Sequence, residues 1–596
     1  MTESSPTPSP DPWGPFEAAL LKQLGAALIA VGSPTEPDAM RALVDWDGGP
    51  QGDAAFPVHR LAAAAHVPVS EFADHLFDVV RPSGEVESVT AMGAYLNFVA
   101  DPTRLTDRTL RTVLGRGAEY GHWPSMFEAA CVEHTSANPT GPFHIGRVRN
   151  AIIGDTLARV MRAAGTPVTT QYYVDDMGRQ AAMITWIWSK PEAEWPPEIK
   201  AAIEGTPEAE EKPDSHRGRP YPALSAYLKT HPDAAQEVAG LVERLESGAA
   251  PPEHRALAEE ILGGMVQSLA RLGISFDEYV WESDFIRNGA VNQVLERLHH
   301  APHGRQEENG AWAIDTSSYG LPKEKTNVVF QRANGTSLYV SRDVAYHLSK
   351  FARFRQVVDV LGQDHRLHAL TLQALLAEIG EPRRPEFVIY QDITVPDGGR
   401  MSTRGGSAVW LDALLFEAVE RARKEVLARR EDLAPNEVVH IAEAVATGAV
   451  RYHIVRVAPE KPVVFRWEDA LSFEGRSGPF CQYSYARAAS VLRKSGVEGP
   501  PYPFEAARIL DPEETALIRV LARLPRTVRY AAQSGHIHAV AGYAHNLADQ
   551  FNRFYHAIPV LSSGDERASR IALVAAVHQA LGNALDLLGV SRLEAM

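Results

Sequence analysis

One stretch of the sequence places a histidine and a glycine where a strand is expected to lead into a helix. It runs from Glu133 through Asn138-Pro-Thr-Gly-Pro142 to His144-Ile-Gly146-Arg147. The unpaired N–H groups and positive dipole end of a helix N-terminus favour phosphate. A glycine lets a flat ligand approach the backbone, and a histidine can donate to a phosphate oxygen that gains charge as a bond breaks. These residues could carry out phosphate chemistry on a nucleotide, but a lone His-x-Gly is more typical of a polar loop on an ordinary α/β domain.

The segments around this stretch predict a strand–loop–helix–strand unit. Residues 127–132 and 168–174 are apolar runs typical of buried strands. Between them, two prolines keep the loop out of both elements, and residues 149–164 carry an apolar stripe at helical spacing. A second half repeats this order, with strands at 356–362 and 387–390 and a helix at 368–379. The pattern predicts a parallel sheet flanked by helices.

Polar residues also follow the strand that ends at Gly362, namely Gln363-Asp364-His365. Ligands of open parallel sheets bind at the carboxyl ends of strands, near a switch in strand order. We therefore expect a nucleotide between His144 and Asp364. The chain contains neither a G-x-G-x-x-G fingerprint nor a Walker P-loop, which argues against dinucleotide-binding proteins and P-loop NTPases.

Two further segments could bind charged substrates. Glu282 and the run from Tyr339 to Asp343 supply carboxylates and aromatic rings. Taken alone, the same run would be read as a polar helix start. The loop 397–406 has four glycines together with Arg400 and Arg404, so it can close on a triphosphate and neutralise a leaving pyrophosphate.

The first stretch resembles the HIGH region of class I aminoacyl-tRNA synthetases. Ser136-Ala-Asn138-Pro, Phe143-His-Ile-Gly and Ile153-Gly-Asp155 resemble arginyl-tRNA synthetases in particular, and 400–403 resembles an altered KMSK loop. Arg147 stands where the second histidine of HIGH is usual, so the role of that imidazole is not carried over. The resemblance implies an α/β fold, with a class I synthetase Rossmann-like parallel-sheet catalytic domain, a small α+β N-terminal domain and an all-α C-terminal anticodon-binding domain.

The residues and the resemblance together predict four groups of site residues. Those for catalysis are His144, Gly146, Arg147, Arg400, Met401, Ser402 and Arg404. Those for ATP are Phe143, His144, Gly146, Gly362, Asp364 and Met401. Those for arginine are Glu133, Ser136, Asn138, Glu282, Tyr339, Asp343 and His365. Those for tRNA are Asn97, Arg476, Gln482, Tyr483, Arg487, Phe551 and Arg553.

Length and composition predict several domains. A chain of 596 residues is longer than a single hydrophobic core usually organises. We expect a loose proline-rich tail at 1–14, an N-terminal tRNA-contacting domain at 15–107, a catalytic domain at 125–430 and a helical anticodon-binding domain at 440–596. An acidic, proline-rich helical insertion is expected at 190–255, one strand-like piece at 89–99 and one helix at 513–530. In the helical region, arginines interleaved with aromatic residues suit unpaired RNA bases, and we expect about half of these aromatics to be core.

Net charge, cysteine content and apolar runs limit the possible ligands, metal sites and location of the protein. The net charge of −16 argues against a uniformly basic nucleic-acid surface but leaves room for basic grooves. The two cysteines are 350 residues apart, so we expect buried thiols and no protein-bound zinc. No secretory signal or membrane-spanning run is evident, which predicts a cytoplasmic location.

The reaction implied by the resemblance joins L-arginine to the 3′-terminal adenosine of its cognate tRNA. ATP with its Mg²⁺ activates arginine to the adenylate and releases pyrophosphate, and tRNA must be bound first. We expect a monomer whose partners are arginine, ATP and arginine-accepting tRNA, with no membrane. Two alternatives stay open: a class I synthetase for another amino acid, and a catalytically silent, synthetase-like RNA-binding protein. A simple adenylyltransferase would not need the long helical region.

Overall fold

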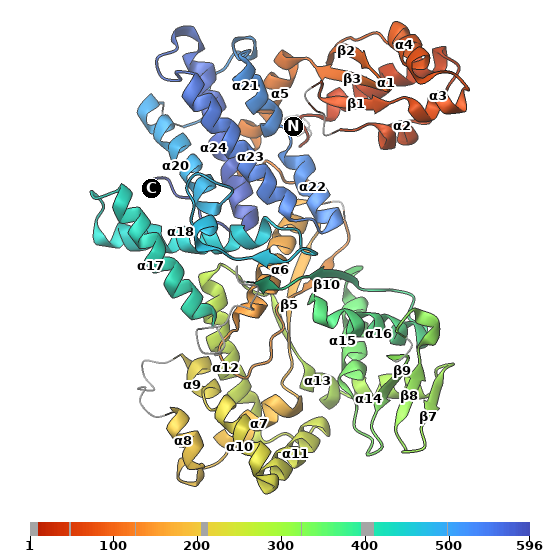
Figure 1. Cartoon of the computed structure of the whole chain (residues 1–596), viewed down its shortest axis with the longest axis vertical. Helices are drawn as coiled ribbons and strands as arrows, with labels where there is room; N and C mark the ends of the chain where they lie inside the picture. Colours follow the sequence, from red (N-terminus) through yellow and green to blue (C-terminus); the bar gives the residue numbers. More distant parts are fainter. Residues whose placement is uncertain are drawn as a thin grey trace, which may run out of the picture.

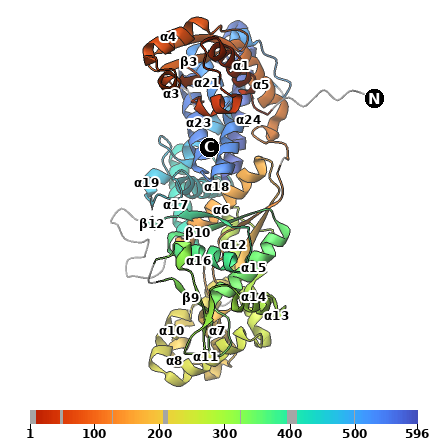
Figure 2. The same cartoon turned by 90° about the vertical axis from the view of Figure 1, so that its right-hand side faces the viewer.

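The computed structural model describes residues 10–46, 49, 51–125, 127–203, 212–322, 325–394, 410–497 and 499–596. The molecule is elongated (Figures 1 and 2). The N-terminal domain and the helical C-terminal domain lie at one end, the parallel sheet lies in the middle, and the insertion helices form the other end. The sheet is thus held between two helical bodies.

The N-terminal domain packs helices against a three-stranded antiparallel sheet. Its elements are α1 (Gly14–Ala30), α2 (Pro37–Leu43), β1 (Ala54–Pro57), α3 (His59–Ala64), α4 (Val69–Val79), β2 (Val86–Met92), β3 (Tyr95–Ala100) and α5 (Pro102–Arg116). The sequence predicts one strand-like piece over 89–99, but the structure divides it into β2 and β3. The reason is Gly93, whose φ of +57° suits a tight turn between antiparallel strands.

The catalytic sheet has five parallel strands in the order β11-β10-β4-β5-β6. They are β4 (Ala130–Glu133), β5 (Val168–Val174), β6 (Glu278–Trp281), β10 (Gln356–Gly362) and β11 (Glu386–Tyr390). The chain builds outward from β4 to β6 on one side and from β10 to β11 on the other. The strand order therefore switches between β4 and β10, which is where a ligand is expected.

Helices flank this sheet. They include α6 (Ile145–Ala163), α7 (Gly178–Trp188), α12 (Pro252–Arg271), α13 (Glu282–Arg287), α14 (Ala290–His299), α15 (Tyr339–Arg353) and α16 (Arg366–Glu378). A small antiparallel sheet follows α14, formed by β7 (Gly304–Gln306), β8 (Trp312–Asp315) and β9 (Asn327–Gln331). Helix α6 begins at Ile145, four residues before the predicted start at 149, because His144 caps it.

The insertion is a helical layer with its own core. It contains α8 (Pro197–Ile203), α9 (Pro213–Gly218), α10 (Tyr221–Thr230) and α11 (Pro232–Glu246). Apolar side chains of these helices pack against α7, among them Leu224, Val238 and Leu241. Its acidic residues therefore accompany a packed layer, which the proline-rich composition alone does not indicate.

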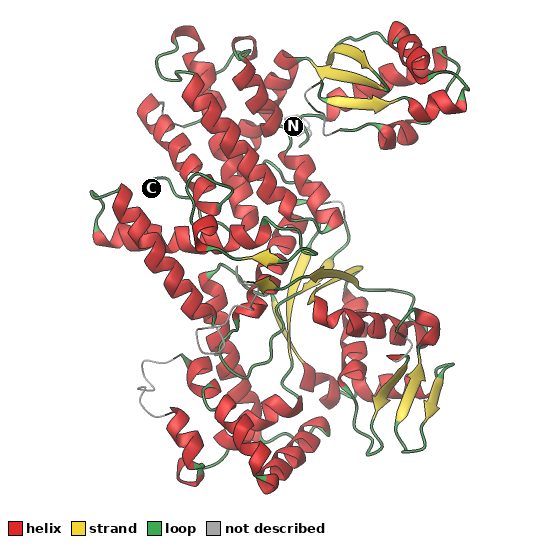
Figure 3. Cartoon of the chain, in the orientation of Figure 1, coloured by secondary structure: helices red, strands yellow, loops and turns green. Residues whose placement is uncertain are grey.

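The C-terminal domain is almost entirely helical (Figure 3). Its helices are α17 (Leu411–Arg429), α18 (Pro435–Val455), α19 (Trp467–Ala470), α20 (Gly478–Ser495), α21 (Pro512–Leu521), α22 (Leu524–Ser534), α23 (His538–Ala557) and α24 (Arg567–Leu588). Short strands β12 (Ile393–Thr394) and β13 (Val463–Val464) join it to the sheet domain. The single helix expected over 513–530 is two helices, α21 and α22, because Pro525 lacks an N–H and suits only a helix start.

The fold shows where the two cysteines and the most apolar helix lie. Both cysteines are buried free thiols, as predicted. Among the described residues, one helical segment, Gly564–Leu588, is long and apolar enough to cross a membrane, and 83% of its apolar window is buried inside the protein. This burial is what a core helix of the bundle requires.

Candidate active site

A cavity of about 780 Å³ opens at the carboxyl ends of β4 and β10. Its walls come from the loop after β4, the first turn of α6, the start of α15, and α16. Predicted site residues that line it are Glu133, Ser136, Asn138, Arg147, Glu282, Tyr339, Asp343, Gly362, Asp364 and His365. The structure thus gathers residues from sequence positions 133 to 365 around one space.

His144 is the N-cap of α6. Its Nδ1 accepts a hydrogen bond of 2.9 Å from the Gly146 N–H, so the proton of the neutral ring is on Nε2. Burial lowers the pKa of His144, and the Arg147 guanidinium lowers it further, which keeps the ring neutral at neutral pH. A Cβ at Gly146 would lie 3.0 Å from that Nδ1, so the glycine also protects the cap.

Two buried arginines anchor α6. The Arg149 guanidinium donates to the carbonyls of Gln391 (2.5 Å) and Ala458 (3.0 Å). Arg451 of α18, whose side chain is fully buried, donates to Asp155 at 2.5 Å. Because both partners come from distant segments, α6 is fixed against the helical domain and the sheet.

The other residues predicted to bind the nucleotide lie near the same edge of the parallel sheet. Phe143 is buried, and its carbonyl accepts the Leu411 N–H at 2.8 Å. Gly362 ends β10, and a Cβ there would lie 2.5 Å from the Asp364 carboxylate. The Asp364 side chain is 77% exposed and the His365 side chain 39%. Asp364 is therefore the freer of the two to meet a ligand.

Asp343 lies between two histidines. Its Oδ1 is 2.9 Å from His347 Nδ1, and its Oδ2 is 2.5 Å from His368 Nε2. Burial alone would raise the pKa of Asp343, but the two histidines lower it far below its usual range. The Tyr339 ring lies beside the His368 ring, with centroids 5.2 Å apart and ring planes tilted by 38°. An ionised carboxylate beside an aromatic wall is the arrangement expected for a guanidinium.

Glu282 is buried, and an internal arginine already contacts its carboxylate. Arg342 Nε donates to Glu282 Oε1, and Arg342 Nη1 donates to the Ser337 carbonyl at 2.9 Å. The sequence assigns Glu282 to the substrate guanidinium without this partner. Of the two carboxylates, Asp343 is the one that no arginine of the described residues contacts.

The loop after β4 holds the other end of the cavity. Thr135 and Ser136 have positive φ values of 74° and 38°, a conformation that side chains rarely adopt. The Ser136 hydroxyl donates to Glu133 Oε1 at 2.9 Å, and Asn138 Nδ2 donates to Asp175 at 3.0 Å. Tyr173 lines the same space, and its buried hydroxyl has no partner within the described ranges. A ligand here would meet preset polar groups.

The loop that the sequence predicts to bind pyrophosphate cannot be compared with the structure. Arg400, Met401, Ser402 and Arg404 lie outside the described residues.

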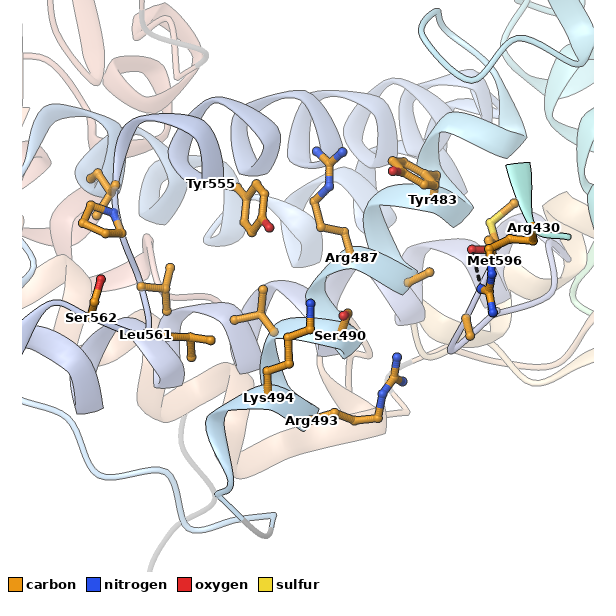
Figure 4. A pocket seen from close by; sticks show the side chains of 16 residues that line it. Arg430, Tyr483, Arg487, Ser490, Arg493, Lys494, Tyr555, Leu561, Ser562 and Met596 are labelled. Carbon is orange, nitrogen blue, oxygen red and sulfur yellow. Dashed lines mark hydrogen bonds between the residues drawn. The ribbon is translucent and has the colours of Figure 1, made fainter. Parts of the chain in front are cut away.

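A second cavity, of about 570 Å³, lies in the helical domain (Figure 4). The Arg487 guanidinium lies 4.9 Å from the Tyr483 ring centroid and 5.1 Å from that of Tyr555. Further cationic side chains on its wall are Arg430, Arg493 and Lys494, and Arg430 Nη1 donates to the carbonyl of Met596 at 3.0 Å. Cations and flat rings that face one space suit unpaired nucleic-acid bases.

The structure separates the predicted tRNA residues into exposed and buried ones. Arg476 and Arg553 are exposed, and Tyr483 is 37% exposed. Gln482 is fully buried and donates to the carbonyls of Ala444 and Ser591, both at 3.0 Å. Phe551 is also fully buried, and Asn97 is 7% exposed. A direct RNA contact by these last three side chains does not fit this structure, because each packs inside a domain.

Sequence reasoning missed the cationic partners of the site. His347, Lys350 and His368 contact Asp343, Asp359 or Glu133. One signal was available: Asp359 is a lone carboxylate in the apolar strand 356–362, and a buried carboxylate requires a partner. The spacing of His347 and Lys350 places both on one helix face, but the sequence does not say which strand they meet.

Comparison with known proteins identifies similar chains over nearly the full length. Residues 110–467 match the family model for tRNA synthetases class I (R), catalytic domain, and residues 481–596 match the DALR anticodon binding domain. A protein of Methanocella arvoryzae named arginine–tRNA ligase is 40% identical over 540 residues, which cover 90% of this chain and 92% of that one. One of Halorubrum lacusprofundi with the same name is 37% identical, covering 98% and 99%.

A solved structure agrees with this similarity. The arginyl-tRNA synthetase of Thermus thermophilus superimposes with a TM-score of 0.80 at 28% identity, covering 98% of this chain and 100% of that one.

Proposed function

Because this chain belongs to the class I arginyl-tRNA synthetases and is an arginine–tRNA ligase that uses ATP, we propose that the cavity at β4 and β10 is where arginine and ATP react. Its substrates are arginine, ATP and arginine-accepting tRNA. The arginine carboxylate attacks the α-phosphorus of ATP, and pyrophosphate leaves. The ribose hydroxyl of the terminal tRNA adenosine then attacks the carbonyl of the adenylate, and AMP leaves. Neither step needs a protein nucleophile, so positioning and charge stabilisation supply the rate.

In this proposal the N-terminal end of α6 binds the phosphates of ATP. His144 donates from Nε2 to the α-phosphate as its charge grows, and Gly146 leaves space for the adenine. The support is the cap bond to Nδ1, which leaves Nε2 as the donor. Arg147, in the same turn, adds a permanent positive charge to the cavity wall. Phe143 packs beneath this turn, and Gly362 and Asp364 meet the nucleoside.

The arginine site uses Asp343 as its guanidinium acceptor. The single observation that carries this assignment is the Asp343 carboxylate, which is ionised and held from both sides at the cavity wall. Tyr339 covers the methylene stem, and Glu282, which is paired with Arg342, forms part of the cavity wall. Ser136 and Asn138 bind the α-amino and carboxylate groups at the other end of the cavity, with His365 at its rim.

The loop at 397–406 completes the phosphate site in this proposal. Arg400 and Arg404 neutralise the leaving pyrophosphate, and Met401 and Ser402 follow the family pattern of this loop. Mg²⁺ arrives with ATP as part of the substrate. No resident metal or zinc is invoked, since the one described cluster with metal-ligand spacing, Glu133, His347 and Asp359, is already occupied by the Lys350 ammonium group.

The helical domain reads the tRNA through the cavity of Figure 4. Tyr483, Tyr555 and Arg487 would stack on or hold unpaired anticodon bases, and Arg476 and Arg553 would contact the backbone. The N-terminal domain is proposed to contact the tRNA body. We further propose that the enzyme is a cytoplasmic monomer. Light scattering of the purified protein can check the oligomeric state.

Amino-acid-dependent charging of total tRNA tests the site. We expect charging with arginine alone, and arginine-dependent pyrophosphate exchange only when tRNA is present. Asp343→Asn should raise the KM for arginine about a hundredfold with little change for ATP, since a charge-assisted pair becomes a neutral contact. An equal rise for both substrates would place Asp343 outside the guanidinium pocket.

A further inference from the structure

A buried row of charged side chains lies beside the proposed arginine pocket. It begins where the parallel register of β4 and β10 pairs Glu133 with Asp359. Paired positions on adjacent strands hold the two carboxylates a few ångströms apart, where they repel each other in a low-dielectric interior. Such a pair needs a cation between its members.

Lys350 of α15 supplies that cation. Its side chain is fully buried, and its Nζ donates to Asp359 Oδ1 at 2.7 Å and to Glu133 Oε2. The ammonium also lies 4.0 Å from the Tyr346 ring centroid. Burial lowers the pKa of Lys350, but Asp359 and Glu133 outweigh it and raise the pKa, so the amine stays charged.

His347 continues the row toward the pocket. Its Nε2 is 2.8 Å from Asp359 Oδ2, and its Nδ1 is 2.9 Å from the main-chain carbonyl oxygen of Asp343 and 2.9 Å from Asp343 Oδ1. Burial and the Lys350 ammonium lower the pKa of His347, but the carboxylates of Asp359 and Asp343 outweigh them and raise it to about 10. The ring is therefore an imidazolium, with a donor on each nitrogen.

The two ends of the row are the two ends of the proposed substrate site. At one end, His368 holds the second oxygen of Asp343 at 2.5 Å. At the other, the second oxygen of Glu133 accepts from the Ser136 hydroxyl at 2.9 Å. Three carboxylates (Glu133, Asp343 and Asp359) face Lys350 and His347, and burial raises the pKa of Glu133 against the opposing effect of Lys350. An arginine guanidinium would bring a further cation to the Asp343 end of the row.

We propose that His347 and Lys350 are positioning residues, which fix the Asp343 carboxylate at a set distance from Ser136 and so set the length of the guanidino amino acid that the enzyme accepts. This inference rests on the proposed arginine site. A carboxylate has about four acceptor positions. His368 occupies one on Oδ2, and the His347 imidazolium lies against Oδ1 while it also bonds the Asp343 carbonyl. The rest remain for the substrate, and the row prevents the carboxylate from turning toward a longer or shorter side chain.

The test uses two variants that each keep one of the His347 contacts. In His347→Asn the amide nitrogen can occupy the place of Nδ1, which preserves the donor to Asp343. In His347→Gln it can reach the place of Nε2, which preserves the donor to Asp359. The measurement is tRNA charging, with kcat and KM for arginine and for homoarginine, which is one methylene longer. His453→Gln is the matched control, because His453 is buried in α18 and bonds only the Val464 carbonyl within the described chain.

Loss of the donor to Asp343 should appear as lost selectivity. For His347→Gln we expect kcat/KM for arginine to fall about tenfold, mainly through KM, and that for homoarginine to fall less than about threefold. His347→Asn should keep most of the wild-type arginine-to-homoarginine ratio, and His453→Gln all of it. A lower melting temperature shared by all three variants would not produce this order.

Two results would overturn the inference. One is a His347→Gln enzyme with wild-type selectivity. The other is an equal loss of selectivity in His347→Asn and His347→Gln. If His347→Gln does not fold, a loss of selectivity in His347→Asn alone also overturns the inference. Asp343→Asn separates this failure from failure of the proposed site. If Asp343→Asn raises only the KM for arginine while both His347 variants keep their selectivity, the site holds and the row has no part in length selection. If Asp343→Asn leaves the KM for arginine unchanged, the proposed site itself is wrong.

Discussion

His144 has two separable tasks in this structure, and substitution can divide them. Its Nδ1 caps α6 by accepting the Gly146 N–H at 2.9 Å, and its Nε2–H is left to serve the α-phosphate. Asparagine is among the preferred N-cap residues, because its side-chain oxygen can accept the same N–H. It does not extend to the position of Nε2. His144→Asn should therefore keep the cap and lose the donor, whereas His144→Ala loses both.

The expected magnitudes follow from these two contacts. Loss of a donor that stabilises a developing charge costs about 10²–10³ in rate. Loss of an N-cap costs about 1 kcal/mol of unfolding free energy. We thus expect both variants to lose activation to the same degree, and only His144→Ala to lose stability. Because the ring is neutral at neutral pH, the loss should not depend on pH between about 7 and 9.

The assay is arginine- and tRNA-dependent exchange of pyrophosphate into ATP, with urea unfolding of the same samples. The KM for arginine should stay near the wild-type value, since His144 does not contact the guanidinium site. A His144→Asn enzyme with more than about a third of the wild-type exchange rate would refute the donor role. Equal rates in both variants together with equal stability would refute the capping argument instead.

Three further predictions concern packing, pH and tRNA. Gly154→Ala should lower the unfolding free energy by about 1–3 kcal/mol or more in urea titration, because the new Cβ would lie 2.2 Å from His134 side-chain atoms; unchanged stability would mean that α6 and β4 can separate freely. Burial lowers the pKa of His134 to about 4, so the folded state keeps this ring neutral while the unfolded chain protonates it near its usual value. Its contribution to stability is present above about pH 6.5 and is lost as the pH falls toward 4, so replacing His134 by Gln should flatten the acid side of the stability curve. Arg487→Ala should raise the KM for tRNA about tenfold and leave those for arginine and ATP unchanged, because it removes the cation from between the Tyr483 and Tyr555 rings; a change in the KM for arginine would contradict a purely tRNA-binding role.

Elements with strong local signals were predictable from the sequence. The strands 168–174 and 356–362 have the predicted bounds, because continuous apolar runs next to turn residues leave few alternatives. Local signals failed where one residue redirects the chain: Gly93 turns an apparent strand into a hairpin, and Pro525 divides an apparent helix. The exact start of α6 depended on a histidine cap, which is less common than a Ser, Thr, Asp or Asn cap.

The site shows a different limit. From the rule for parallel strands the sequence brings His144 and Asp364 to one sheet edge, and in the structure Asp364 lines one cavity together with Asp343 and with Arg147, three residues after His144. The sequence does not pair Glu133 with Asp359, because that pairing depends on the register between strands separated by more than two hundred residues. Once the register is known, the rest follows from electrostatics. Two neighbouring buried carboxylates need Lys350, the imidazolium of His347 uses the remaining oxygen of Asp359, and its other nitrogen then fixes Asp343. The rigid substrate-facing carboxylate is therefore a consequence of strand register, which explains why residues with no expected substrate contact can set the specificity of the pocket.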